Sequence, residues 1–84
     1  MSYRILLVED DRQIREVIED YFSDKSGGEI TLVTATDGEE GMDLIQYEEF
    51  DLVMLDIMLP HVDGFTICRE IRRKSILLYH NRFP

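Results

Sequence analysis

The sequence predicts an α/β fold, in which helices cover both faces of a parallel sheet. Short apolar runs, typical of strands buried on both faces, alternate along the chain with segments whose apolar residues recur every three or four positions, as in helices. The helical segments are also long enough for right-handed crossovers between parallel strands. A strand–helix alternation of this kind indicates one parallel sheet.

The first strand–helix unit lies at the amino terminus. The apolar run from Ile5 to Val8 predicts a buried strand and ends at three acids, Glu9 to Asp11. The apolar residues that follow have the spacing i, i+3, i+4, i+7, i+8 and form one stripe of a helix: Ile14, Val17, Ile18, Tyr21 and Phe22. Asp11 is placed to cap this helix, and Gly27-Gly28 breaks the chain after it.

The second unit begins with residues 30–35, which alternate as an edge strand does. Residues 36–38 form a turn and a helix cap, with Asp37 at its centre, and precede a helix over 39–47, in which Met42 and Ile45 are expected to face inward. Gly41 inside this helix costs about 1 kcal/mol relative to alanine.

The third unit repeats the pattern. Residues 52–55 form another buried run, which ends at Asp56. A loop that contains Pro60 and Asp63-Gly64 leads into a helix marked by Phe65, Cys68 and Ile71. Basic residues 72–74 suit the negative carboxyl end of that helix.

Length and charge restrict the function. The chain has 84 residues, enough for one domain, and its single cysteine excludes a disulfide framework. Nine basic and 18 acidic residues give a net charge of −9, which argues against direct binding to nucleic acid or an anionic membrane surface. Neither a membrane span nor a signal peptide is expected, so a cytoplasmic location is predicted.

Acidic residues follow two of the predicted strands. Glu9-Asp10 ends the first and Asp56 ends the third. In open parallel sheets, ligands bind outside the carboxyl ends of the strands, so these carboxylates converge if the two strands are neighbours. Carboxylates so close together repel one another, and Mg²⁺ would neutralise them. An aspartate beside that cation is also a reasonable nucleophile toward phosphorus.

Four segments carry a family resemblance: RILLVEDD from Arg4, TDGEE from Thr36, DLVMLDIMLP from Asp51 and DGF from Asp63. Together they resemble the receiver domain of bacterial two-component response regulators over residues 4–74, in the branch whose members carry a winged-helix DNA-binding domain. The resemblance implies a flavodoxin-like sheet with strand order 2-1-3. It also implies a cytoplasmic signalling protein of transcription regulation that accepts phosphate and is not an enzyme.

The resemblance further implies the role of each site residue. Asp56 would accept a phosphoryl group from a sensor histidine kinase. Mg²⁺ would be held by Glu9, Asp10, Asp56 and the main-chain carbonyl of Met58. Pro60 and Gly64 would shape the loop beside the site, although an ordinary turn proline explains Pro60 equally well.

The carboxyl-terminal residues depart from the family pattern. Complete receivers add two strands and two helices, with a Ser or Thr after the fourth strand and a Lys after the fifth. The expected division is therefore an incomplete receiver over 1–74 and an off-pattern tail over 75–84. The segment Asn81–Pro84 resembles the approach to a fourth strand; alternatively, residues 76–79 form a makeshift one. Neither Lys74 nor Lys25 follows a predicted strand, so neither is assigned as the missing lysine.

Two other functions compete with the phosphoacceptor. A truncated receiver could serve only as a binding or assembly module. An aspartate-nucleophile phosphatase would require a second Asp two residues after the nucleophile, and the residue there is Met58, which argues against that enzyme.

Self-association is also expected, as a dimer or larger assembly. Its grounds are that the third strand would lose its outer neighbours, unless 76–79 replaces one, and that the first helix's face of the sheet would lose a covering helix.

Overall fold

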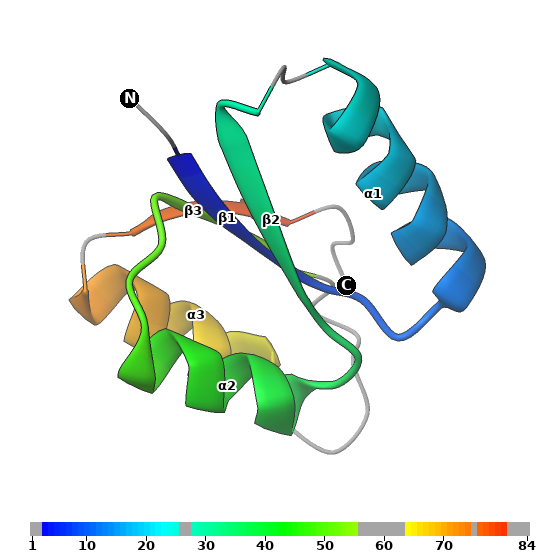
Figure 1. Ribbon diagram of the computed structural model, residues 1–84. Coiled ribbons are helices and arrows are strands. Elements are labelled where there is room, and N and C mark those ends of the chain that lie inside the picture. The colour runs from blue at the N-terminus through cyan, green and yellow to red at the C-terminus, as the bar shows by residue number, and fades with distance from the viewer. Residues whose placement is uncertain (1–2, 26–27, 56–63, 75, 81–84) are drawn as a thin grey trace.

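The computed structural model describes residues 3–25, 28–55, 64–74 and 76–80. Figure 1 shows the expected alternation of strands and helices. In chain order these are β1 (Tyr3–Val8), α1 (Arg12–Lys25), β2 (Ile30–Ala35), α2 (Gly38–Tyr47), β3 (Leu52–Leu55), α3 (Gly64–Arg73) and β4 (Leu77–His80). Each predicted element is present, and β2 and β3 have the predicted bounds.

The strands form one parallel sheet in the order β2-β1-β3-β4. The order 2-1-3 is confirmed for the first three strands, and β2 lies at an edge, as its alternation predicts. The makeshift fourth strand also forms, one residue later than expected, and pairs with β3 from Leu52↔Leu77 to Leu55↔His80. The outer edge of β3 is therefore paired within the chain, which removes one of the two grounds for self-association.

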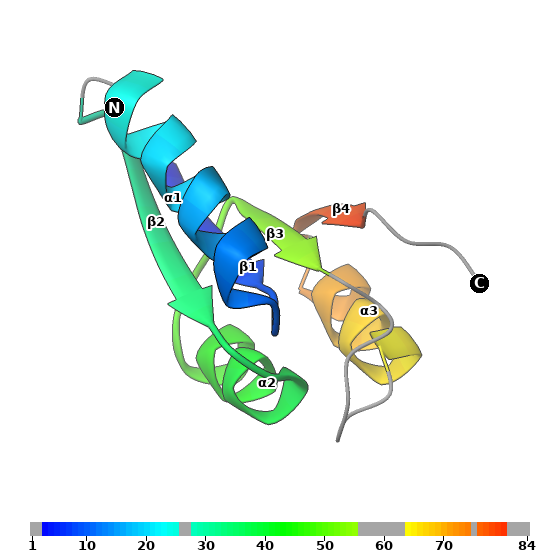
Figure 2. The same cartoon turned by 90° about the vertical axis from the view of Figure 1, so that its right-hand side faces the viewer.

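Helices lie on both faces of the sheet. Figures 1 and 2 show α2 and α3 together on one face and α1 on the other, over β1 and β2. Among the described helices, none lies on the α1 side of β3 and β4. Because strand side chains alternate between the faces, each helical layer meets every second residue of a strand.

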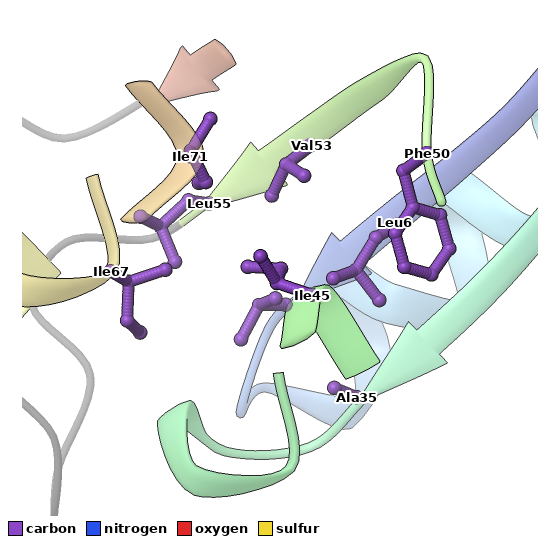
Figure 3. Packing of buried hydrophobic residues seen from close by; sticks show 9 residues of the cluster. Leu6, Ala35, Ile45, Phe50, Val53, Leu55, Ile67 and Ile71 are labelled. Carbon is purple, nitrogen blue, oxygen red and sulfur yellow. The ribbon is translucent and has the colours of Figure 1, made fainter. Parts of the chain in front are cut away.

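The main core lies between the sheet and the pair α2 and α3, as Figure 3 shows. Its fully buried side chains come from strands and helices alike: Leu6, Val8, Ala35, Ile45, Val53, Leu55, Ile67 and Ile71. On the α1 side, Ile5 and Leu7 are buried as well, whereas Leu52 and Met54 remain half-buried. The cover on that face is thus thinner over β3 than over β1.

Side-chain caps determine where two of the helices begin. The Asp11 carboxylate accepts hydrogen bonds from the amides of Gln13 (2.9 Å) and Ile14 (3.2 Å), which confirms the predicted cap of α1. At α2, Asp37 Oδ1 accepts from the Glu40 amide at 2.9 Å, and a Glu40 carboxylate oxygen accepts from the Thr36 amide at 2.8 Å. The second bond goes to the residue before the cap, so the arrangement is a variant of the capping box.

Contacts at the amino edge of the sheet hold β1 and β3 in register. The Arg4 amide donates to Asp51 Oδ2 and the Asp51 amide donates to the Arg4 carbonyl, each at 2.8 Å. The Arg4 guanidinium also pairs with Glu48 and lies 5.2 Å from the centre of the Phe50 ring. These contacts align the two strands from the end opposite to the predicted site.

The expected division of the chain after residue 74 remains a prediction, and β4 belongs to the same sheet as β1 to β3. Within the described ranges, no helix combines the length and apolarity that crossing a lipid bilayer requires.

Candidate functional site

The predicted acidic site lies at the carboxyl edge of the sheet. The register pairs Val8, the last residue of β1, with Leu55, the last residue of β3. Glu9 directly follows Val8, and Asp56 directly follows Leu55 in the sequence. The two strands that carry the predicted carboxylates are therefore neighbours that end level with one another, as the prediction requires.

Glu9 is a buried charged residue, with only 1% of its surface exposed. Its amide donates to the Ala35 carbonyl at 3.1 Å, which extends the contact between β1 and β2 past the end of the strand. Its carboxylate oxygen Oε2 accepts from the Asp11 amide at 3.2 Å. Burial of an ionised carboxylate is unfavourable unless hydrogen bonds or a cation compensate it, and a cation nearby would add to the stability of Glu9 in this position.

The adjacent acids have different roles. Asp10 is exposed, so its carboxylate can be reached from solvent. Asp11 is engaged with the amino terminus of α1, as the cap prediction requires. A buried carboxylate next to an exposed one provides the oxygen donors that Mg²⁺ prefers, and the pair therefore fits the expected cation.

Arg15 is a further residue at this edge, and the sequence interpretation missed it. From the first turns of α1, its Nη1 donates to the Glu9 carbonyl oxygen at 3.0 Å. A basic residue one turn after a capping aspartate was the available signal, but the spacing alone does not show which group the guanidinium reaches.

Of the other predicted site residues, only Gly64 lies within the described ranges. Asp56, Met58 and Pro60 lie outside the described residues. Gly64, expected in the loop, is the first residue of α3, and its proposed effect on the loop stays a prediction. Within the described ranges no group of three metal-binding side chains occurs, and the predicted metal set has only Glu9 and Asp10 there.

Lys74 lies away from this edge. Its ammonium donates to the carbonyl of Ile45 and, at 3.4 Å, to that of Gln46, at the carboxyl end of α2. This position agrees with the expectation that Lys74 is not the family's missing lysine.

A hollow of about 410 Å³ lies at the opposite edge of the sheet, where β1 and β3 begin. It is lined by Arg4, Glu48, Glu49, Phe50, Asp51, Lys74 and Ile76. Ligands of open parallel sheets bind at the carboxyl ends of the strands, so this hollow is separate from the acidic site.

Comparison with known proteins gives a consistent result. Residues 5–80 match the response regulator receiver domain family. The chain is 46% identical over 70 residues to the uncharacterized transcriptional regulatory protein YcbL of Bacillus subtilis and 40% identical over 75 residues to the probable C4-dicarboxylate response regulator DctR of the same organism. These alignments cover 83% and 89% of the chain but only 30% and 33% of the two relatives, so the chain spans about a third of their length.

The fold is similar to that of solved receivers. The response regulator TrrA of Thermotoga maritima, in complex with Mg²⁺ and BeF, is 36% identical, with a TM-score of 0.75 over 89% of this chain and 62% of that one. TrrA in complex with the histidine kinase ThkA gives 33% identity and a TM-score of 0.79 over 95% of this chain and 67% of that one.

Proposed function

Because the chain belongs to the response regulator receiver domain family, we propose that it is a phosphoacceptor of two-component signal transduction. Asp56 accepts a phosphoryl group from a sensor histidine kinase. Mg²⁺ is held by Glu9, Asp10, Asp56 and the carbonyl of Met58. The observation that carries this proposal is the buried Glu9 at the end of β1, level with the end of β3, which Asp56 follows.

The proposed transfer needs positioning more than covalent assistance. An Asp56 carboxylate oxygen forms a bond to phosphorus while the bond from phosphorus to the donor imidazole nitrogen breaks, and the leaving imidazole takes up a proton. Bound Mg²⁺ would offset the negative charge on the phosphoryl oxygens. Glu9 and Asp10 contribute by holding that cation at the strand ends, Glu9 from a buried position and Asp10 from an exposed one.

Similar proteins support the proposed cofactor and partner. The TrrA receiver occurs in complex with Mg²⁺ and BeF, and TrrA also occurs in complex with a histidine kinase. On this basis we propose Mg²⁺ as the cofactor and a histidine kinase as the partner. The chain is a signalling phosphoacceptor, and the only reaction we propose for it is its own phosphorylation.

The relatives indicate a larger setting. YcbL is named a transcriptional regulatory protein and DctR a response regulator, and this chain spans about a third of each. We propose that it serves transcription regulation in the cytoplasm as the receiver part of such a system. Its net charge of −9 makes direct contact with DNA unfavourable, so any DNA binding would belong to another region or protein.

One observation favours the alternative of a binding or assembly module. Val17 and Tyr21 on α1 are 68% and 59% exposed, and no described helix covers the α1 side of β3 and β4. An exposed apolar surface of this kind could serve for association independently of phosphorylation.

Phosphorylation of the intact chain separates the two functions. Incubation with acetyl phosphate and Mg²⁺, followed by mass spectrometry, should show one phosphoryl group that hydroxylamine removes, as expected of an acyl phosphate. It should be absent in Asp56→Asn and retained in Asp43→Asn, an exposed acid on α2 that serves as the control. A phosphoryl group that persists in Asp56→Asn would refute the assignment, and no modification at all would favour the assembly module.

A further inference from the structure

We propose that Arg15 is a positioning residue of the metal site, an inference that rests on the proposed function. Its guanidinium holds the backbone of the turn that presents Glu9 and Asp10. The observation behind it is the 3.0 Å hydrogen bond from Arg15 Nη1 to the Glu9 carbonyl oxygen. This contact reaches from α1 back to the end of β1, six residues earlier in the sequence.

The carbonyl that Arg15 holds belongs to the peptide unit between the two proposed metal ligands. That peptide links Glu9 to Asp10, so its orientation determines where the Asp10 carboxylate lies relative to that of Glu9. A charged donor forms a stronger hydrogen bond to a carbonyl than a neutral one does. Arg15 therefore restrains the peptide on which the geometry of the pair depends.

Two more contacts restrain the same turn. The Asp11 amide donates to Glu9 Oε2 at 3.2 Å, and the Asp11 carboxylate caps α1 through the amide of Gln13. Together with the bond from Arg15, these contacts hold the turn at the Glu9 carbonyl, the Glu9 carboxylate and the Asp11 carboxylate. Asp10, between these points, is exposed and faces solvent from a constrained backbone.

Helix stability does not explain the presence of Arg15. The amino end of a helix disfavours positive charge, yet α1 begins with Arg12, has no acid in its first turn and carries Arg15 close behind. Arg12 pairs with Glu16, one turn further along, at 3.0 Å. Arg15 has Glu19 at the equivalent spacing, but its hydrogen bond goes to the Glu9 carbonyl instead.

Two effects of Arg15 on Mg²⁺ binding have opposite signs. Its positive charge alone would repel the cation, so its removal would tighten binding. Its hydrogen bond preorganises the ligand pair against the mutual repulsion of the carboxylates, so its removal would weaken binding. We expect preorganisation to prevail, because the bond is made to the backbone of a ligand residue, and groups that orient metal ligands typically contribute about tenfold or more in affinity.

Calorimetric titration of the intact chain with Mg²⁺ tests the inference. Arg15→Gln should raise the dissociation constant about tenfold, and Arg15→Lys, which keeps the charge and a donor nitrogen, should raise it less. The matched control is Arg12→Gln, which removes the same charge from the same end of α1 but has an exposed side chain paired with Glu16. It should change the constant by less than about twofold, as expected of a weak surface ion pair.

A second measurement does not depend on the metal. In the absence of Mg²⁺, hydrogen exchange at the Asp11 amide, which donates to Glu9, should be faster in Arg15→Gln than in Arg12→Gln. If Arg15→Gln does not fold, Arg15→Lys provides both comparisons.

The outcomes are distinguishable. Equal effects of Arg15→Gln and Arg12→Gln, or tighter binding in Arg15→Gln, would overturn the role of Arg15 and leave the metal site intact. If the unmodified chain does not bind Mg²⁺, or if Asp10→Asn binds it equally well, the proposed function fails and the role of Arg15 fails with it.

Discussion

Gly41 on α2 lies so close to Val8 at the end of β1 that a β-carbon added to Gly41 would be 2.8 Å from Val8 Cγ2. Real β-carbons essentially never come so close to a neighbour. The glycine that costs helix propensity therefore allows α2 to approach the strand that ends at Glu9. Packing explains a residue that the helical pattern alone treats as unfavourable.

Gly41→Ala should consequently destabilise the fold. The alanine gains about 1 kcal/mol in helix propensity, but overpacking of a tight core typically costs 1–3 kcal/mol. Val8 is fully buried and has a short branched side chain, so it cannot move aside easily. We expect a net loss of about 1 kcal/mol and, for a domain of this size, a melting temperature lower by about 4–8 °C.

The double variant Val8→Ala/Gly41→Ala provides the check on that cause. Removal of the Val8 methyl groups makes room for the new β-carbon, so the double variant should lose less stability than the two single variants combined. Strictly additive losses in urea unfolding would contradict the close contact.

Mg²⁺ should stabilise the fold, because it relieves carboxylate repulsion in the native state only. At ten times its dissociation constant, the gain in unfolding free energy should be about 1.4 kcal/mol. Thermal unfolding with and without Mg²⁺ measures it. Asp10→Asn should abolish the gain, and the control Asp43→Asn, at an exposed position on α2, should retain it. If Mg²⁺ does not change the melting temperature of the unmodified chain, the metal site is ruled out.

Self-association remains a prediction, now on the basis of the α1 face alone. Val17 and Tyr21 are exposed on α1, and Leu52 and Met54 of β3 are half-buried on the same side of the sheet. Light scattering at micromolar concentration should give about twice the 9.9 kDa mass of one chain. Because each chain carries a net charge of −9, association should strengthen as salt screens the repulsion.

Substitutions locate the interface. Val17→Glu or Tyr21→Glu should shift the assembly to monomer. Tyr47→Glu, at a position 84% exposed on α2, should have no such effect and serves as the control. A monomer in the unmodified chain that unfolds cooperatively would show that this face needs no partner.

Lys74 should stabilise the packing of α3 against α2. Its ammonium donates to the last-turn carbonyls of α2, where a positive charge is also favoured by the helix dipole. Lys74→Met should lower the unfolding free energy by about 0.5–1.5 kcal/mol. Arg72→Met, which removes an exposed charge from the same segment, is the control in urea unfolding, and equal losses in the two variants would contradict the capping role.

Local patterns in the sequence determined the elements and the location of the candidate site. The buried runs 5–8 and 52–55, the apolar stripe of α1 and the caps Asp11 and Asp37 act through neighbouring residues, so they could be interpreted without the fold. The acids that follow two such runs identified the carboxyl edge of the sheet by the same reasoning.

Contacts between distant residues were decided by the tertiary structure alone. The pairing of β4 with β3, the approach of Gly41 to Val8 and the bond from Lys74 to the end of α2 join residues far apart in the chain. No local period encodes such contacts, because they depend on how the helices settle on the sheet. For the same reason the sequence indicated Glu9 and Asp10 as ligands, whereas only the docking of α1 against the end of β1 showed that Arg15 holds the peptide between them.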